Sequence, residues 1–538
     1  MKRIKNSPWL LVLCVIAGAF IGGSYVEHIG GNRLNIISSS GSNRINNLLK
    51  IIDDQYVDDV DMDSLVEGAL PQILSDLDPH SVYISAKDVQ KAKDDLKGSF
   101  SGVGIEFTIQ EDTVRVQNII KGGPAERAGI LAGDKIVSID GKPFVGKVVT
   151  NEEAMHRLKG PEGTKVEIGV LRYGEKAVKK FIVKRGEIHV SSISAAYMIN
   201  DSTGFLRVKT FGDTTLGEVN SALAKLSDEG MKRLILDLRD NSGGYLHVAV
   251  ALVDEFLPAG RLIVYTEGRK APREDYRSSG SGRYQDLPLV VLINESSASA
   301  AEIVAGALQD NDRATIIGRR SFGKGLVQQQ ISFTDGSMIR LTVARYYTPS
   351  GRCIQKPYTV DGKGYEYDLI SRYQNGELFN QDSIKHEGPA YHTTIGREVY
   401  GGGGITPDIF VPEDTTQSTT YYVDAARNGL ILQYAFKYTD QNRPRLKAFT
   451  TMPAMERYLK SQGLVERFAD YGESHGLKRR NLLIEKSYRL LERYIHSRII
   501  YNMLDEEAWM EYLNRDDNDV KEALKVVTSK DWKPKKGA

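Results

Sequence analysis

The stretch LPLVVLINESSASAAEIVAGAL, residues 287–308, decides the fold class of the central part of this chain. The apolar run at 287–294 predicts a strand, and small residues follow it in a short loop. A helix is expected to begin at about Ala300. The same alternation of strands and helices continues over residues 187–412, which predicts an α/β core.

Other segments of this core follow the same pattern. The expected strands are GFLRVKTF, LILDL and ATIIG, with helices over 216–226 and about 245–257 and a hairpin closed at Asp335-Gly336. The polar segments 268–286 and 358–404 read as loops. A glycine turn, Asn241-Ser242-Gly243-Gly244, directly follows the buried strand LILDL.

Residues 98–186 predict a compact β module that precedes the core. SGVGIEFTI and TVRVQNII alternate apolar and polar residues around a turn at 111–112. A short helix is expected from Pro124 to Gly129, and KIVSIDGKPF predicts a strand with an Asp-Gly turn. Thr150 is expected to cap a helix in a capping box with Glu153, and GTKVEIGVLR to form the closing strand.

The remaining segments read as an N-terminal leader and two helical regions. Lys2, Arg3 and Lys5 precede the apolar run WLLVLCVIAGAFIGG, a pattern typical of an export signal. We expect this segment, residues 1–30, to be either a signal peptide that is cleaved near Ala17-Gly18-Ala19 or a membrane anchor that is retained. A buried helix of the folded protein is the alternative. Residues 31–45 read as a linker, and 46–97 as helical with interruptions at Pro71 and Pro79. Residues 413–538 read as a helical extension for packing or homo-oligomerisation, with its strongest amphipathic stretch at LLIEKSYRLLERYIHSRII.

Composition excludes several classes of protein. The 538 residues carry 71 basic and 70 acidic side chains, and without a basic run we expect no nucleic-acid partner. The two cysteines, Cys14 and Cys353, form no CxxC motif and are not expected to form a disulfide. The nine histidines have no ligand spacing, so no metal or other cofactor is expected.

Ser299 stands where a strand ends and a helix begins. Backbone N–H groups at a helix N-terminus can stabilise an oxyanion beside a serine nucleophile, which also needs a general base. On this segment alone, a simple helix N-cap is the favoured interpretation of Ser299.

Lys324 is the candidate base. It lies between Gly323 and Gly325 in GRRSFGKGLVQ, residues 318–328, where burial would lower its pKa and allow it to accept a proton. Gln328, four residues later, can orient the amine. A surface turn lysine is the alternative, and the segment is not a P-loop because Gly325 stands where Ser or Thr is required.

Three segments together resemble the C-terminal processing peptidases, the S41 family of serine proteases. They are LDLRDNSGG at 236–244, NESSASAAE at 294–302 and GRRSFGKGLVQ. The resemblance extends over about residues 40–412 and assigns Ser299 as nucleophile, Lys324 as base 25 residues later, and Gln328 as its partner. It also implies an oxyanion hole from the Ala300 N–H and from Gly243 or Gly244, between which the sequence does not choose. A Ser-His-Asp triad through His247 is the alternative chemistry, but no GxSxG elbow is present.

The module at 98–186 resembles a PDZ domain, the usual companion of this peptidase. GVGIEF matches the carboxylate-binding loop and the strand that pairs with a peptide, and a purely structural module is the alternative. The implied peptide-binding residues are Gly102, Val103, Gly104, Ile105, Glu106 and Phe107.

The sequence therefore predicts a multidomain α/β protein, a PDZ-like β module placed before a ββα-type S41 core with helical segments at both ends. Its segments are 1–30, 31–97, 98–186, 187–412 and 413–538. We expect a serine endopeptidase that recognises and cleaves the C-terminal tails of exported proteins. Its expected place is the bacterial cell envelope, in the periplasm or at the periplasmic face of the inner membrane, with membrane contact through the N-terminal segment. A catalytically silent PDZ scaffold or receptor in the envelope is the alternative.

Overall fold

The computed structural model describes residues 41–110, 112–358, 363–386 and 389–529, which fall into two units. The first unit, residues 1–73, contains α2 (Gly41–Gln55) and all but the end of α3 (Met62–Ser75). The predicted export segment and residues 31–40 of the linker lie outside the described residues. None of the described helices is both long and apolar enough to cross a membrane.

Two expectations for this first unit are wrong. Residues 41–45 belong to α2 rather than to a linker, and Pro71 lies inside α3 instead of ending it. A proline removes one backbone hydrogen bond, and here the helix continues for four further residues beyond it.

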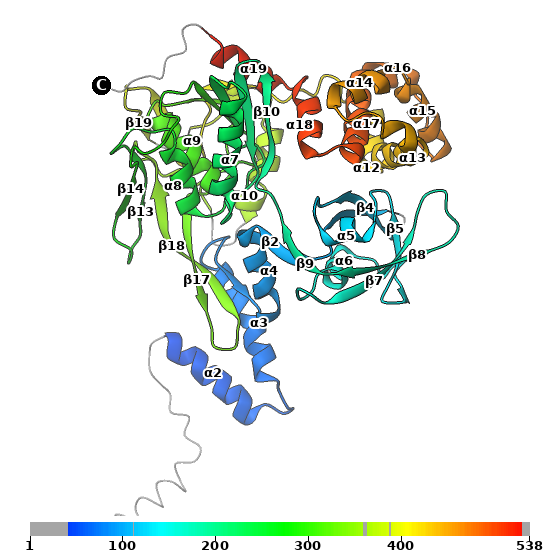
Figure 1. The fold of residues 1–538 in the computed structure, drawn as a ribbon. Coiled ribbons are helices and arrows are strands. Elements are labelled where there is room, and N and C mark those ends of the chain that lie inside the picture. Colours follow the sequence, from blue (N-terminus) through cyan, green and yellow to red (C-terminus); the bar gives the residue numbers. More distant parts are fainter. Residues whose placement is uncertain (1–40, 111, 359–362, 387–388, 530–538) are drawn as a thin grey trace, which may run out of the picture. The chain divides into compact units, whose positions relative to one another are not determined.

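The β module lies at the start of the second unit, residues 74–538, where it forms a sheet of order β3-β4-β5-β7-β8 with β6 paired to β5 (Figure 1). The expected Gly129 helix stop, the Asp140-Gly141 turn and the Thr150 cap are all present. GTKVEIGVLR was expected to close the module, but β8 follows it as a further strand. The elements are α4 (Ala86–Lys97), β2 (Ser99–Gly102), β3 (Ile105–Gln110), β4 (Thr113–Ile119), α5 (Pro124–Ala128), β5 (Lys135–Ile139), β6 (Lys142–Pro143), α6 (Asn151–Leu158), β7 (Lys165–Leu171), β8 (Lys179–Lys184) and β9 (Gly186–His189).

The α/β core is a six-stranded sheet of order β10-β11-β12-β15-β16-β21. Apart from the antiparallel pair β10–β11, its neighbouring strands run parallel. The strands are β10 (Ile193–Asn200), β11 (Thr203–Val208), β12 (Arg233–Asp237), β15 (Leu289–Ile293), β16 (Thr315–Gly318) and β21 (Ile409–Phe410). The three strands predicted from GFLRVKTF, LILDL and ATIIG are therefore confirmed as β11, β12 and β16.

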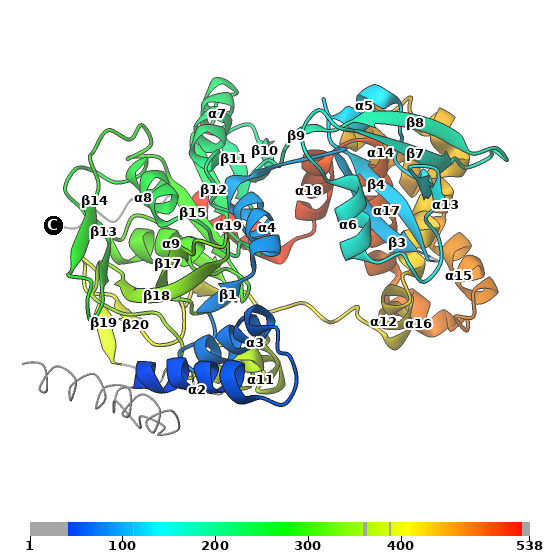
Figure 2. The ribbon, with the colours of Figure 1, turned by 90° about the horizontal axis from the view of Figure 1, so that it is seen from below.

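Helices cover both faces of this sheet (Figure 2). Along β12, Leu234 and Leu236 pack into one core with α7 (Thr215–Asp228), α8 (Leu246–Asp254) and α9 (Ala300–Asp310). Ile235, between them, points to the other face and packs with side chains of α18 (Glu506–Asn514) and α19 (Asn518–Val527). Helices α18 and α19 thus pack on the core sheet itself.

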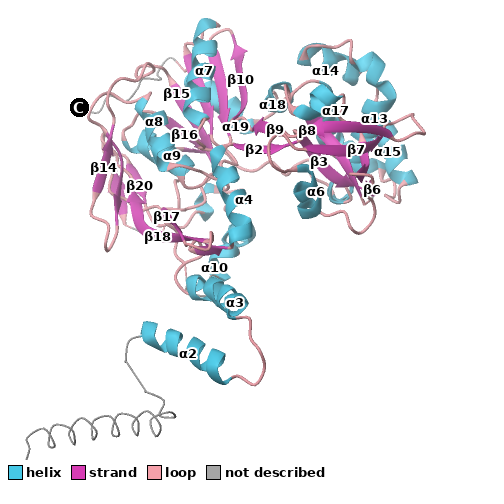
Figure 3. Ribbon diagram, turned by 60° about the horizontal axis from the view of Figure 1, so that its bottom comes forward, coloured by secondary structure: helices cyan, strands magenta, loops and turns pink. Residues whose placement is uncertain are grey.

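A second sheet has the order β1-β18-β13-β14, with β17 also paired to β18 (Figure 3). The hairpin at Asp335-Gly336 is confirmed by the pairing of Ser332 with Met338. Three strands fall where none was expected: β1 lies inside the predicted helical segment, β14 lies inside the predicted loop 268–286, and β13 lies in a stretch for which no element was predicted. The strands are β1 (Val82–Ile84), β13 (Leu262–Glu267), β14 (Glu274–Arg277), β17 (Leu326–Ser332) and β18 (Met338–Tyr347).

The predicted loop 358–404 also contains regular structure, and the C-terminal segment is helical as expected. The loop region holds α10 (Lys363–Glu366), α11 (Asp368–Gln374), a 3₁₀ turn (Gln381–Ser383), β19 (Ala390–His392) and β20 (Glu398–Tyr400). The C-terminal helices are α12 (Thr420–Arg427), α13 (Leu430–Leu446), α14 (Met452–Lys460), α15 (Leu464–Ser474), α16 (Asn481–Lys486) and α17 (Tyr488–Met503), followed by α18 and α19. The predicted amphipathic stretch breaks at Ser487, and α17 is buried on several sides at the centre of its own hydrophobic core.

Candidate active site

Ser299 lies at the carboxyl end of the core sheet, in the turn between β15 and α9. Its backbone has φ 54° and ψ −115°, a conformation that a residue with a side chain rarely adopts. Such strain is found where surrounding structure fixes a functional group. The neighbouring Ser297 is fully buried, and its hydroxyl donates to the Leu238 carbonyl at 2.7 Å, which leaves Ser299 as the better-placed serine.

Glu302 joins the serine turn to the lysine loop. Its Oε2 accepts hydrogen bonds from the Ser299 N–H at 2.9 Å and from the Lys324 N–H at 2.8 Å. Two bonds of this length to one atom place the two nitrogens within about 6 Å of each other. Oε1 accepts from the Ser321 hydroxyl and the Gly323 N–H, at 2.5 and 2.7 Å. Burial raises the pKa of Glu302 to about 7, against the effect of these four donors.

Tyr346 makes a second link between the same two segments. Its hydroxyl contacts the Ser299 carbonyl at 3.1 Å and the Lys324 carbonyl at 2.5 Å, from a fully buried position on β18. Burial raises the pKa of Tyr346 well above its usual range, so the hydroxyl stays protonated and able to donate. Glu302 and Tyr346 together fix both the N–H and the C=O groups of the serine and the lysine.

The Lys324 side chain is half-buried, so the burial expected for it is only partly reached. Removal from water lowers the pKa of its ammonium group, the Arg340 guanidinium lowers it further, and Glu302 and Asp78 act in the opposite direction. The Nζ donates to Gln328 Oε1 over a long 3.5 Å contact. The backbones of Ser299 and Lys324 are thus brought to the same site, and no hydrogen bond between their side chains is formed in the described structure.

The glycine turn lies against the serine. A Cβ placed on Gly243 would stand 2.6 Å from Ser299 Cβ and 2.9 Å from the Ala300 nitrogen. The Gly243 N–H already donates to the Asn241 side chain at 2.8 Å. In the described part of the chain, the N–H groups of Gly244 and Ala300 have no hydrogen-bond acceptor. The glycine turn and the start of α9 therefore each offer one free N–H group near Ser299.

Comparison with known proteins identifies the family of this chain. Residues 202–369 match the model of peptidase family S41, and residues 101–184 match that of the PDZ domain. A carboxy-terminal-processing protease of Bartonella bacilliformis is 36% identical, over 70% of this chain and 91% of its own length. A probable CtpA-like serine protease of Staphylococcus aureus (strain COL) is 34% identical, over 68% of this chain and 73% of its own.

The chain belongs to peptidase family S41. It is a serine-type peptidase related to the C-terminal processing proteases, with a PDZ domain ahead of the catalytic domain. Among solved structures it is similar to the photosystem II D1 C-terminal processing protease, with 25% identity, a TM-score of 0.35, and coverage of 70% of this chain and 94% of that one. Residues 21–88 match the N-terminal domain of the activating protease CtpB, and residues 421–505 match a family of unknown function, DUF8443.

In this S41 peptidase, the segment Asp78-Pro79-His80-Ser81 also reaches the site, which sequence reasoning missed. The His80 carbonyl accepts from Gln328 Nε2 at 2.6 Å, and His80 Nε2 contacts the Tyr365 hydroxyl at 2.7 Å. Burial and the charge of Lys324 lower the pKa of His80 to about 4, so its ring is neutral at pH 7. The polar run Asp-Pro-His-Ser between apolar segments was the only signal in the sequence.

Other residues considered as site candidates lie elsewhere. His247, considered for a Ser-His-Asp triad, is an exposed residue of α8 beside Tyr245. Cys353 is a free, half-buried cysteine, and Cys14 lies outside the described residues. No cluster of three or more potential metal ligands occurs within the described ranges.

Of the predicted peptide-binding residues of the PDZ domain, Ile105, Glu106 and Phe107 lie on β3, at the edge of its sheet, whereas Gly102 ends β2, which pairs with β9, and Val103 and Gly104 connect the two strands. β3 is an end strand, paired only with β4 in the described sheet, and an end strand is where a peptide can add as a further strand. Gly104 has φ 79°, and Val103 is buried, with its carbonyl accepting from the Ala125 N–H at 2.8 Å. The Glu106 side chain points to a neighbouring helix, where its carboxylate accepts a hydrogen bond from the Tyr501 hydroxyl of α17.

Proposed function

We propose that this peptidase cleaves the C-terminal tails of exported proteins with Ser299 as nucleophile and Lys324 as general base. The observation that carries the proposal is the shared Glu302 carboxylate oxygen, which accepts from the backbones of both residues. The lowered pKa of Lys324 supports its role as a base, since more of the amine is neutral at a given pH.

The reaction follows the acyl-enzyme route. Neutral Lys324 takes the hydroxyl proton of Ser299 as Oγ attacks the scissile carbonyl. The tetrahedral intermediate collapses, the peptide C–N bond breaks, and the Lys324 ammonium returns the proton to the leaving amine. Water then attacks the ester with Lys324 as base, which releases the new C-terminus and restores Ser299. Gln328, held by the His80 carbonyl, directs the amine of Lys324.

We infer that the Ala300 and Gly244 N–H groups form the oxyanion hole. Both N–H groups lack an acceptor in the described structure, whereas the Gly243 N–H is occupied by Asn241. An oxyanion hole needs donors that are free until charge develops, which favours Gly244 over Gly243. Gly243 then serves by its small size, because a side chain there would displace Ser299.

The substrate's tail would add to β3 of the PDZ domain as an extra strand. The loop at Gly102, Val103 and Gly104 would hold the terminal carboxylate through its N–H groups, and Ile105, Glu106 and Phe107 would pair with the tail. Export through residues 1–30 and action in the bacterial envelope complete the proposal, with domains at 31–97, 98–186 and 187–412 and a C-terminal helical segment whose last two helices, α18 and α19, pack on the core sheet.

Cleavage of β-casein, an unstructured protein, tests the proposed dyad. Ser299→Ala and Lys324→Ala should each abolish cleavage while leaving binding of an immobilised C-terminal peptide intact. Ser296→Ala is the matched control, because Ser296 is exposed in the same loop and should keep full activity. Undiminished cleavage by Ser299→Ala would refute the proposal.

The substrate class needs a separate experiment in the organism that carries this chain. Mass spectrometry of envelope proteins, with the wild-type enzyme and with Ser299→Ala, should reveal C-terminally extended forms only in the variant. Identical C-termini in both samples would contradict the assignment to exported tails.

A further inference from the structure

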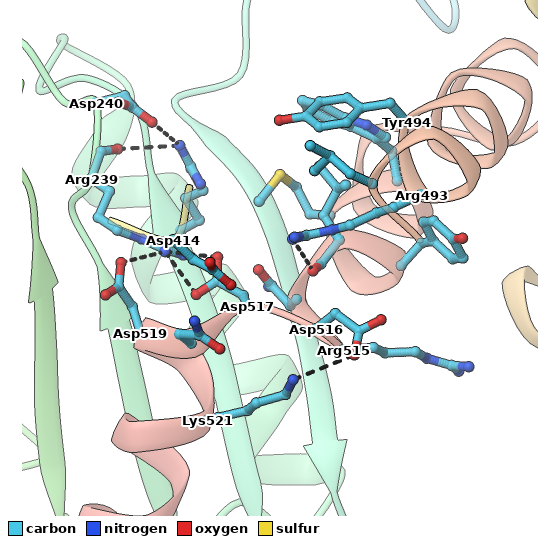
Figure 4. Close-up of a pocket in the computed structure, with 18 of the residues that line it drawn as sticks. Arg239, Asp240, Asp414, Arg493, Tyr494, Arg515, Asp516, Asp517, Asp519 and Lys521 are labelled. Atoms are coloured by element: carbon cyan, nitrogen blue, oxygen red, sulfur yellow. Dashed lines mark hydrogen bonds and ion pairs between the residues drawn. The ribbon is translucent and has the colours of Figure 1, made fainter. Parts of the chain in front are cut away.

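Arg239 of the glycine-turn segment is held from the far end of the chain (Figure 4). Its guanidinium is only 8% exposed and donates to Asp237 Oδ1 at 2.9 Å and Oδ2 at 2.8 Å. The same group donates to Asp517 at 2.9 Å and to Asp519 at 2.9 Å, both near the start of α19. Arg239 therefore joins β12 to a helix that begins 279 residues later in the sequence.

The helix α19 is fixed where it meets Arg239. Val520, Ala523 and Val527 lie on one side of it and are almost fully buried against strands of the core sheet. Asp517 is its N-cap, and its Oδ1 also accepts from the Val520 N–H at 3.0 Å. Carboxylates are favoured at a helix N-terminus, where unpaired N–H groups and the helix dipole are positive. The two aspartates are thus held on a rigid element.

Asp519 is also connected to the loop that contains Lys324 and, through it, to the loop that contains Ser299. Its Oδ2 lies 3.8 Å from Arg319, which comes five residues before Lys324. Arg319 donates in turn to Glu295 at 2.8 Å, four residues before Ser299. The start of α19 therefore contacts the segments that follow β12 and β16 directly, and the segment after β15 through Arg319.

Arg239 is separated from the glycine turn by only a few hydrogen-bonded residues. Asp240, the next residue, exchanges two hydrogen bonds with Asn294, at 2.9 and 2.8 Å, just before the serine loop. The Asn241 carbonyl accepts from the Ala298 N–H at 2.8 Å, and its side chain holds Gly243. A shift of Arg239 would be passed to Gly243 and Gly244 through two residues that also bind the serine loop.

We propose that Asp517 and Asp519 are positioning residues of the peptidase, and that α19 is part of its catalytic domain. By holding Arg239, they keep the glycine turn at the distance from Ser299 that stabilises the transition state. The inference rests on the proposed function, since it acts through the proposed oxyanion hole. It assigns a role in catalysis to residues beyond the peptidase-family match, which ends at 369.

The test compares a double variant, Asp517→Asn with Asp519→Asn, with the single variant Asp516→Asn, both in the full-length chain. Asp516 is the matched control, because its side chain is 78% exposed and its ion pair with Lys521 lies on the surface. Steady-state cleavage of β-casein and thermal unfolding are measured for both variants. We expect kcat to fall about tenfold or more in the double variant only, because small shifts of a catalytic group are costly. KM should be unchanged, and the unfolding temperature should stay within a few degrees of the control.

Two results would overturn the inference. One is a kcat equal to that of Asp516→Asn; the other is a loss of kcat that merely follows the loss of folded protein. If the double variant is unfolded at the assay temperature, Asp519→Asn alone is measured, because Asp517 still caps α19. Ser299→Ala is assayed alongside. Activity of Ser299→Ala would refute the proposed dyad. If Ser299→Ala is inactive but the aspartate variants keep a normal kcat, only the proposed role of α19 is refuted.

Discussion

Replacing Gly243 by alanine should disable the enzyme by displacing its nucleophile. Gly243 has φ 100°, which costs a residue with a side chain about 1–2 kcal/mol. The new Cβ would also lie 2.6 Å from Ser299 Cβ and 2.9 Å from the Ala298 carbonyl oxygen. Carbon atoms pack at about 3.5–4.0 Å, so the serine turn must move by about 1 Å. A displacement of that size lowers catalysis by about 100-fold.

Gly230→Ala separates the clash from the backbone strain. Gly230 follows α7 with φ 95°, nearly the same conformation, but an added Cβ there meets no atom within 4 Å. Both variants should therefore be destabilised by the backbone strain, and only Gly243→Ala, which adds the clash, should lose kcat. Cleavage of β-casein and thermal unfolding of the two variants measure the difference. Equal kcat in Gly243→Ala and Gly230→Ala would refute the proposed closeness of the glycine turn to the nucleophile.

Three further predictions concern the lysine loop. Arg340→Gln should raise the pKa of Lys324 and move the rising limb of the kcat–pH profile to higher pH, whereas Arg340→Lys keeps the charge and should leave the limb in place. Gln328→Ala should lower kcat about tenfold at constant tail affinity, since the base loses its partner. Burial raises the pKa of Glu302 to about 7, so between pH 4.5 and 7 the folded state holds a proton that the unfolded state has lost. The free energy of unfolding should therefore fall by roughly 3 kcal/mol as the pH rises through that window. Thermal unfolding at pH 5 and pH 8 measures this difference, and Glu302→Gln should remove it.

The parts of the fold that could be predicted are those set by local chemistry. The turns at Asp140-Gly141 and Asp335-Gly336 and the helix stop at Gly129 follow from residues that tolerate positive φ. The buried strands β12 and β15 follow from apolar runs of strand length. Short edge strands do not have such signals: β14, with sequence EDYR, forms only because it pairs with β13.

The candidate site divides in the same way. Ser299, Lys324 and Gln328 could be proposed because their spacing matches a known pattern. Glu302 binds the backbones of Ser299 and Lys324, and the Gln328 side chain accepts from the Lys324 amine over 3.5 Å. Tyr346 could not be proposed, since an aromatic residue in a predicted strand reads as core. Its hydroxyl reaches the Ser299 and Lys324 carbonyls only because β18 crosses beside them.

The start of α19 shows most clearly why a sequence pattern underdetermines a role. Asp517 and Asp519 precede a helix, and on sequence alone each is explained by capping and by the helix dipole. Their partner is a buried arginine in the glycine-turn segment, which no local pattern identifies. A cap needs only one carboxylate, yet two aspartates converge on Arg239, and Asp519 extends to Arg319 as well. The second carboxylate is therefore better explained by the loops it holds than by the helix it begins, and this difference is what the comparison with Asp516→Asn measures.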